Sequence, residues 1–146
     1  MKPNHVYTIK EFKCNYDGDT YTLRLDCGFG LRYTPKQGCR LSGADTPEMK
    51  GGTDTSKAAA KLAKDYAHDF IEEAIRFDGV FVSDEVDKYG RPLGDIQFRD
   101  GRGHMRSLAS ELVRESLAVF YHGQNKNDVA NAHAENFTRL KAAGKL

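Results

Sequence analysis

Hydrophobic and polar positions alternate through the first third of the chain, which is typical of β-strands. The alternation is strict in residues 20–27, where Tyr21, Leu23 and Leu25 fall on one face. Residues 6–14 are rich in Val, Tyr, Ile, Thr and Phe, and turns that contain glycine or proline separate the shorter runs that follow. The pattern predicts an antiparallel meander of short strands at residues 6–14, 20–27, 31–34 and 39–42.

From about Ser56 the hydrophobic period changes to the spacing of a helix. Leu62, Tyr66 and Phe70 form the centre of an apolar stripe, with small and branched apolar residues beside them. Hydroxyl side chains are favoured at helix N-termini because their oxygen accepts a hydrogen bond from a free backbone N–H. The pattern therefore predicts a helix that is entered through Thr55 or Ser56.

The second half of the chain predicts a hairpin followed by two helices. Short apolar runs at residues 80–83 and 93–98 flank a turn around residues 89–92. Helical spacing then marks one helix at residues 105–117 and another at residues 130–140. The polar residues 122–128 form the loop between them. The fold class is therefore α+β, with a small five-stranded barrel-like sheet and three packed helices. No repeat or linker interrupts residues 1–146, so we expect a single domain.

Composition narrows the class of protein without indicating its partner. The 146 residues are 39% hydrophobic and 29% charged, as in ordinary globular proteins. The net charge of +1 gives no polyanion signature, although a local basic groove can exist within a neutral total. No apolar run approaches the length of a membrane span, and the start has no secretory signal. We therefore expect a cytoplasmic protein that does not engage a membrane. We also expect it to act as a monomer.

Cysteine and histidine give no zinc pattern. Cys14, Cys27 and Cys39 cannot all pair within one chain, and we expect them to be reduced residues of the core. The five histidines are scattered, so we expect satisfied or solvated side chains rather than metal ligands. Any metal in this protein should therefore be one that prefers oxygen ligands.

Three polar clusters carry the candidate chemistry, and each has an ordinary structural explanation when taken alone. Residues 17–20, Asp-Gly-Asp-Thr, could be a turn before a strand. Residues 40–48, Arg-Leu-Ser-Gly-Ala-Asp-Thr-Pro-Glu, could be a loop that caps the next helix. Residues 87–91, Asp-Lys-Tyr-Gly-Arg, could be an exposed charged turn.

Together the clusters supply each part that phosphodiester hydrolysis needs. Asp19 and Asp45 suit a hard cation such as Ca²⁺ or Mg²⁺. Glu48 lies three residues beyond Asp45 and is the candidate base for water. Arg40 and Arg91 carry planar guanidinium groups that match phosphate oxygens and can stabilise the charge that develops on phosphorus. The combination favours a metal-assisted nuclease.

The order and separation of these motifs resemble the staphylococcal nuclease family, also called thermonuclease-like, from about Val6 to about Leu140. The resemblance implies an OB-fold-like five-stranded β-barrel with three helices. It also implies a Ca²⁺-dependent endonuclease that cleaves DNA and RNA between phosphorus and the 5′-oxygen and leaves 3′-phosphate ends. Mg²⁺ and Mn²⁺ remain alternative metals.

The same resemblance assigns roles to particular residues. It implies that Asp19 and Asp45 bind Ca²⁺ through their carboxylates and Thr46 through its main-chain carbonyl. It also implies that Glu48 is the general base and that Arg40 and Arg91 are the two catalytic arginines. The residues that it implies bind the substrate are Lys88, Tyr89 and Tyr121. For Tyr121 simple packing at a helix end is an equal alternative.

Several features depart from the family or leave other functions open. The second stacking tyrosine of the family has no clear counterpart, so base preference does not carry over. The chain is nearly neutral, which predicts weaker and more salt-sensitive affinity for polyanions. The glycine-rich residues 49–54 are expected to connect sheet and helix. Two alternatives remain, a non-catalytic domain that binds single-stranded nucleic acid or serves as a scaffold, and a phosphodiesterase of small nucleotides.

Overall fold

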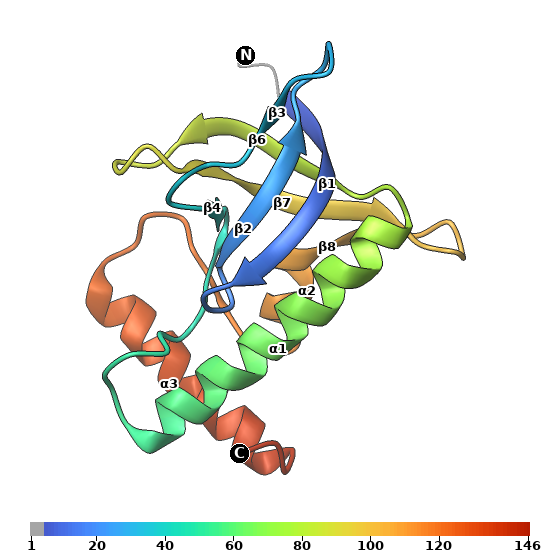
Figure 1. The fold of residues 1–146 in the computed structure, drawn as a ribbon. Helices are drawn as coiled ribbons and strands as arrows, with labels where there is room; N and C mark the ends of the chain where they lie inside the picture. The colour runs from blue at the N-terminus through green and yellow to red at the C-terminus, as the bar shows by residue number, and fades with distance from the viewer. Residues whose placement is uncertain (1–4) are drawn as a thin grey trace.

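A closed barrel of five strands forms the centre of the computed structural model, which describes residues 5–146 (Figure 1). The strands pair in the ring β1-β2-β4-β7-β6 and back to β1. The β4–β7 pair is parallel and the other four pairs are antiparallel. The bounds are β1 His5–Asn15, β2 Thr20–Asp26, β4 Cys39–Leu41, β6 Val80–Val86 and β7 Pro92–Arg99. The OB-like five-stranded barrel that the sequence predicts is thus confirmed.

Four short strands decorate the barrel. β3 (Arg32–Tyr33) pairs with β2 and forms a projecting hairpin, and β8 (Met105–Ser107) pairs with the end of β7. β5 (Ala44–Asp45) pairs with β9 (Val119–Phe120) outside the main sheet. Hydrophobic pattern did not indicate β5, β8 or β9, because two or three residues are too few to establish a period. Met105 was expected to begin a helix and instead lies in β8, where it pairs with Arg99.

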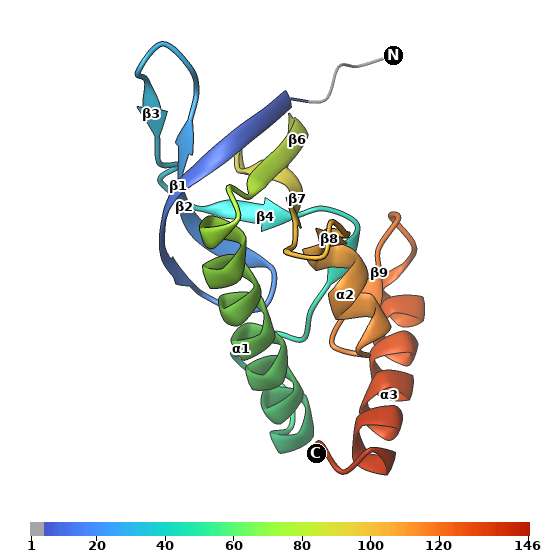
Figure 2. The ribbon, with the colours of Figure 1, turned by 90° about the vertical axis from the view of Figure 1, so that its right-hand side faces the viewer.

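The three expected helices are present, with different boundaries. The bounds are α1 Asp54–Arg76, α2 Leu108–Arg114 and α3 Lys126–Ala142. Thr53 caps α1 rather than Thr55 or Ser56, and its hydroxyl accepts a hydrogen bond from the Ser56 N–H while the Ser56 hydroxyl accepts one from the Thr53 N–H. The helix α3 begins at Lys126, so the polar loop is shorter than expected. Figure 2 shows α1 and α3 extending below the barrel with α2 between its base and α3.

The core lies inside the barrel and continues under the helices. The alternation in β2 buries Tyr21, Leu23 and Leu25 inside the barrel, as expected. Small residues on the buried face of α1 allow its backbone to lie close to β1 and β7, namely Ala59, Ala60, Ala63, Ala67 and Ala74. Cys39 is buried, and burial raises the pKa of its thiol to about 12. Cys14 and Cys27 are exposed, so the expectation of three core cysteines was wrong for two of them.

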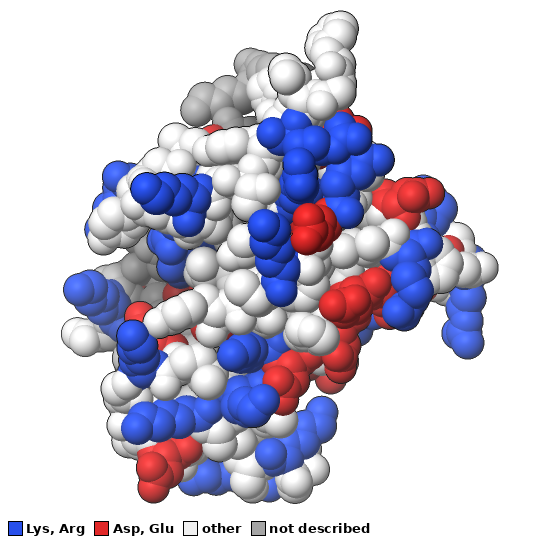
Figure 3. Space-filling model, in the orientation of Figure 1, with Lys and Arg blue, Asp and Glu red and all other residues white. Residues whose placement is uncertain are grey.

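The surface mixes both signs of charge. Lys and Arg gather over β1 and β2 in Figure 3, where the exposed positions include Lys10, Lys13 and Arg24, while acids follow α1. Ion pairs with Asp26 and Glu11 partly neutralise that basic cluster. Within residues 5–146, no helix is both long enough and apolar enough to cross a membrane.

Candidate functional site

Strand pairing brings the three polar clusters of the sequence to one end of the barrel. Thr20 of β2 pairs with Arg40 of β4, and Arg40 pairs with Leu93 of β7. Asp19 therefore precedes β2 at the point where Arg40 lies on the neighbouring strand. Arg91 directly precedes β7 on the other side of Arg40. Segments more than 50 residues apart in sequence thus meet within three adjacent strands.

Asp19 lies behind the surface of this site and is only 3% exposed. Its Oδ2 accepts a hydrogen bond from the Thr46 N–H at 3.1 Å and lies 3.5 Å from Nη2 of Arg40. A Cβ on Gly18 would lie 2.7 Å from Cγ2 of Thr46 and 2.9 Å from Cβ of Ala63. Only glycine lets the β1–β2 turn approach Thr46 this closely, so Gly18 determines the placement of Asp19.

Burial raises the pKa of the Asp19 carboxyl to about 7. The neighbouring Asp17 carboxylate contributes to this raised pKa, while Arg40 and the Thr46 N–H act in the opposite direction. The surroundings of Asp19 therefore stabilise its ionised form less well than water does. A cation beside Asp19 would favour the ionised form and displace the proton.

Asp45 is held by two side chains from distant parts of the chain. Nη2 of Arg40 lies 3.2 Å from its Oδ1, and Nε2 of His133 lies 2.9 Å from its Oδ2. His133 comes from α3, which Asn136 fixes by donating a hydrogen bond to the Ala118 carbonyl just before β9. The sequence predicted a satisfied or solvated histidine, and nothing in its spacing signalled a contact across 88 residues.

The turn between β6 and β7 is organised by Asp87, another residue that the sequence did not single out. Its Oδ1 accepts hydrogen bonds from the N–H groups of Tyr89 and Arg91, and its Oδ2 lies 2.7 Å from Nε of Arg91. Burial alone would raise the pKa of Asp87, but these hydrogen bonds hold it below its usual value. Through these contacts Asp87 orients the Arg91 guanidinium and the backbone of the turn.

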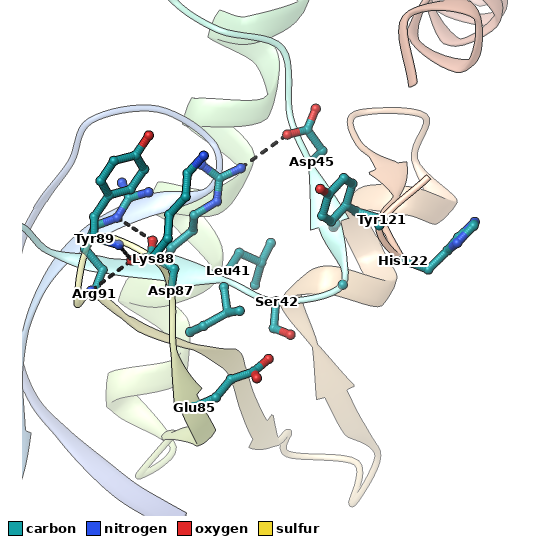
Figure 4. A pocket seen from close by; sticks show the side chains of 15 residues that line it. Leu41, Ser42, Asp45, Glu85, Asp87, Lys88, Tyr89, Arg91, Tyr121 and His122 are labelled. Atoms are coloured by element: carbon teal, nitrogen blue, oxygen red, sulfur yellow. Dashed lines mark hydrogen bonds and ion pairs between the residues drawn. The ribbon is translucent and has the colours of Figure 1, made fainter. Parts of the chain in front are cut away.

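A cavity of about 580 Å³ opens in front of these groups. It is lined by six of the nine site residues that the sequence indicates, Arg40, Asp45, Lys88, Tyr89, Arg91 and Tyr121. In Figure 4, Tyr89 and Tyr121 stand on opposite sides of the cavity, Tyr89 from the β6–β7 turn and Tyr121 from the segment after β9. Tyr121 is 47% exposed, so it lines the cavity instead of packing into the core.

Three predicted site residues do not line this cavity. Asp19 and Thr46 are buried behind Arg40 and join the site through the hydrogen bonds given above. Glu48 is exposed and follows the buried Pro47. Among residues 5–146 no partner lies within hydrogen-bond or ion-pair distance of the Glu48 carboxylate. The structure therefore groups eight of the nine residues and leaves Glu48 at the edge.

The donor atoms beside Asp19 fit a hard cation. Asp19, Asp45 and the main-chain carbonyl of Thr46 offer oxygen ligands, as Ca²⁺ and Mg²⁺ prefer. The Thr46 hydroxyl is buried without a hydrogen-bond partner in the described part of the chain, so this corner of the site contains an unsatisfied polar atom. No three His, Cys, Asp or Glu side chains that the structure describes gather into a ready ligand set. Water or substrate oxygens would have to complete any coordination here.

A comparison of the sequence with known protein families gives a match over most of the chain. Residues 38–145 match a family model described as staphylococcal nuclease homologue. The match includes Arg40, Asp45, Glu48 and Arg91, whereas Asp19 and the first two strands precede it, so it begins later than the resemblance from Val6. No curated protein matches the chain.

Proposed function

Because the chain belongs to the family of staphylococcal nuclease homologues, we propose that it is a metal-dependent nuclease that hydrolyses phosphodiester bonds of DNA and RNA. The observation that carries this proposal is the convergence of Arg40, Arg91 and the two acids Asp19 and Asp45 on one end of the barrel, against a cavity open to solvent. A binding surface alone has no need for two acids, one of them buried, that share one guanidinium.

In the proposed reaction the two arginines bind the scissile phosphate. Arg40 and Arg91 line the same cavity, and Asp87 fixes the orientation of Arg91. Their N–H groups would donate to the non-bridging oxygens and stabilise the extra negative charge of the transition state. Lys88 and Tyr89, with Tyr121 on the opposite wall, would bind the flanking phosphate and bases.

Glu48 is the proposed general base. Its carboxylate accepts a proton from water as the water oxygen bonds to phosphorus, and the bond from phosphorus to the 5′-oxygen breaks. The products are a 3′-phosphate end and a 5′-hydroxyl end, which receives a proton as it leaves. Glu48 is exposed and does not line the cavity, and its place in the loop before α1 would allow it to approach the bound phosphate.

A divalent cation, Ca²⁺ in this proposal, would be held by Asp19, Asp45 and the Thr46 carbonyl. When bound, it would supply Lewis-acid polarisation of the phosphate. Asp19 and Asp45 would be its charged ligands, and Arg40 keeps both carboxylates in place.

We further propose that the chain acts as one domain, as a monomer and in the cytoplasm. One buried cluster joins the barrel to all three helices and includes Leu25, Phe70, Leu112 and Leu140. The three unpaired cysteines are typical of a reducing compartment. Light scattering of the purified protein would test the monomer.

One observation favours a second candidate, a non-catalytic nucleic-acid-binding domain. Glu48 has no contact with the arginines in the described chain, as would be expected if no base were needed. Digestion of single-stranded DNA, duplex DNA and RNA with Ca²⁺, with Mg²⁺ and with a chelator separates the two functions. Metal-dependent cleavage that is lost in Glu48→Gln supports the nuclease, while intact substrates under all conditions support the binding domain.

A further inference from the structure

A second hollow continues the catalytic cavity along the barrel surface. It has a volume of about 170 Å³ and lies between the β6–β7 turn and the segment that connects β3 to β4. Tyr89 and Arg91 line both hollows, so no ridge of other residues separates them. The opposite wall of the second hollow carries Tyr33 and Lys36.

Both walls of this hollow are fixed turns. On one side the Gly38 N–H donates to the Pro35 carbonyl at 3.0 Å, and Gly38 has φ +83°, which only glycine adopts freely. On the other side the Gly90 N–H donates to the Asp87 carbonyl at 3.0 Å, and the Asp87 side chain holds the same turn. The hollow is therefore preformed and does not depend on a mobile segment.

The exposed groups along this path alternate between aromatic rings and cations. Tyr33 is 51% and Tyr89 63% exposed, so both rings are open to solvent and available for stacking. Lys36 and Lys88 have no ion-pair partner among the side chains that the structure describes, in contrast to Lys10, Arg24 and Arg32, which pair with Asp26 or Glu11. Unpaired cations between exposed rings fit phosphates that alternate with unstacked bases.

The path does not end at Tyr33. This ring also lines a third hollow of about 430 Å³, whose lining includes Tyr7 of β1 and Leu25 of β2. The direct route from the catalytic cavity to this third hollow passes Glu85, which lines both and would repel phosphate. The route through Tyr89, Lys36 and Tyr33 avoids that acid.

We propose that the hollow between Tyr33, Lys36 and Tyr89 is a second nucleotide subsite, which receives the unpaired nucleotide beyond the scissile phosphate. This inference rests on the proposed nuclease function. A base can stack on Tyr33 only when it is unpaired, so duplexes cannot use the subsite. Binding energy from this subsite is available to oligonucleotides and not to a dinucleotide held at the arginines.

Binding of fluorescent DNA to the chelator-treated full chain tests the subsite without requiring cleavage. In Tyr33→Ala, we expect the affinity for a single-stranded octanucleotide, relative to that for a dinucleotide, to fall roughly tenfold to hundredfold. Tyr33→Phe keeps the ring and should bind close to wild type. Phe29→Ala is the matched control, because Phe29 is a fully exposed ring at the tip of the same hairpin. Melting temperatures confirm that each variant is folded.

The lysine has an independent readout. Each phosphate contact to a single strand contributes about 0.7 to the slope of log affinity against log salt. Lys36→Gln should lower that slope by about this amount, whereas Lys57→Gln, on the first turn of α1 at the far end of the molecule, should not (Figure 1).

Two results would overturn the subsite. One is an octanucleotide affinity in Tyr33→Ala equal to that of Phe29→Ala, and the other is duplex DNA bound as tightly as a single strand. These results can be told apart from failure of the nuclease proposal. That failure would appear as absence of cleavage by the wild type with Ca²⁺, whatever the binding measurements give.

Discussion

His133 offers the sharpest test of how the site is built, because it contacts a proposed metal ligand from a distant helix. A carboxylate has about four lone-pair positions, and the contacts of Asp45 with Arg40 and His133 use one on each oxygen. Both contacts fix the plane of the carboxylate and still leave positions for a cation. In His133→Leu one of these constraints is lost while the bulk beside Phe137 is kept.

The magnitude follows from the burial of the pair. A hydrogen bond to a charged group contributes about 1.5–3 kcal/mol, and the side chains of His133 and Asp45 are 13% and 27% exposed, so the lower end applies. Nδ1 of His133 is buried without a hydrogen-bond partner in the described chain, and removing it offsets part of this loss. We therefore expect the free energy of unfolding to change by less than about 1 kcal/mol. Partners that orient metal ligands are worth more for binding, and Ca²⁺ affinity should fall about 10- to 100-fold.

Calorimetric titration of Ca²⁺ into chelator-treated protein measures the affinity, and urea unfolding without metal measures the stability. His68→Leu is the matched control, since His68 also contacts carboxylates, those of Asp69 and Glu72, but on the exposed side of α1. An unchanged Ca²⁺ affinity in His133→Leu would refute the positioning role. A higher affinity would refute it as well and would indicate that His133 competes with the metal.

Other perturbations test the remaining parts of the site. Glu48→Gln and Arg91→Ala should each lower cleavage by about two orders of magnitude or more with the circular dichroism spectrum unchanged, and full activity would remove that residue from the mechanism. Asp19→Asn should raise the Ca²⁺ concentration needed for half-maximal cleavage, and excess Ca²⁺ should partly restore the rate. The raised pKa of Asp19 means that a proton occupies this carboxyl below about pH 7, so in the wild type Ca²⁺ affinity should fall about tenfold per pH unit below that value, and a flat profile would contradict the assignment. Gly18→Ala should destabilise the chain by about 1–3 kcal/mol in urea, because its Cβ would press on Thr46; a neutral effect would contradict the close approach.

The sequence predicted the barrel because its signals are local and repeated. Alternation in β2 and the helical stripe of α1 each extend over enough residues to define a period, and both elements are present. The β5–β9 pair has two residues on each strand, and its formation depends on α2 and α3 packing nearby. Such pairings are decided by tertiary contacts, which a single sequence does not display.

The site residues likewise divide into those with a local sequence signal and those that tertiary contacts bring into place. Motifs of charged residues in short segments indicated Asp19, Arg40, Asp45 and Arg91, since each cluster is compact in sequence. His133 has no neighbouring motif, and its contact with Asp45 follows from the position of α3. Asp87 lies inside a recognised motif, but its role in orienting Arg91 depends on turn geometry that only the structure shows.

Charge balance around Arg40 gives a physical reason for the proposed metal dependence. Four carboxylates act on this guanidinium, those of Asp17, Asp19, Asp45 and Asp87, and Arg91 is the second cation of the group. With all four ionised, the charge is −4 from the acids and +2 from the arginines, which leaves −2. Lys88 and Glu85 at the cavity wall cancel one another. This excess of negative charge would weaken the attraction of a phosphodiester to the two arginines that line the cavity. One divalent cation at Asp19 and Asp45 would bring the sum to zero and leave the guanidinium groups free to attract the phosphate, which is the physical basis of the metal dependence that we propose.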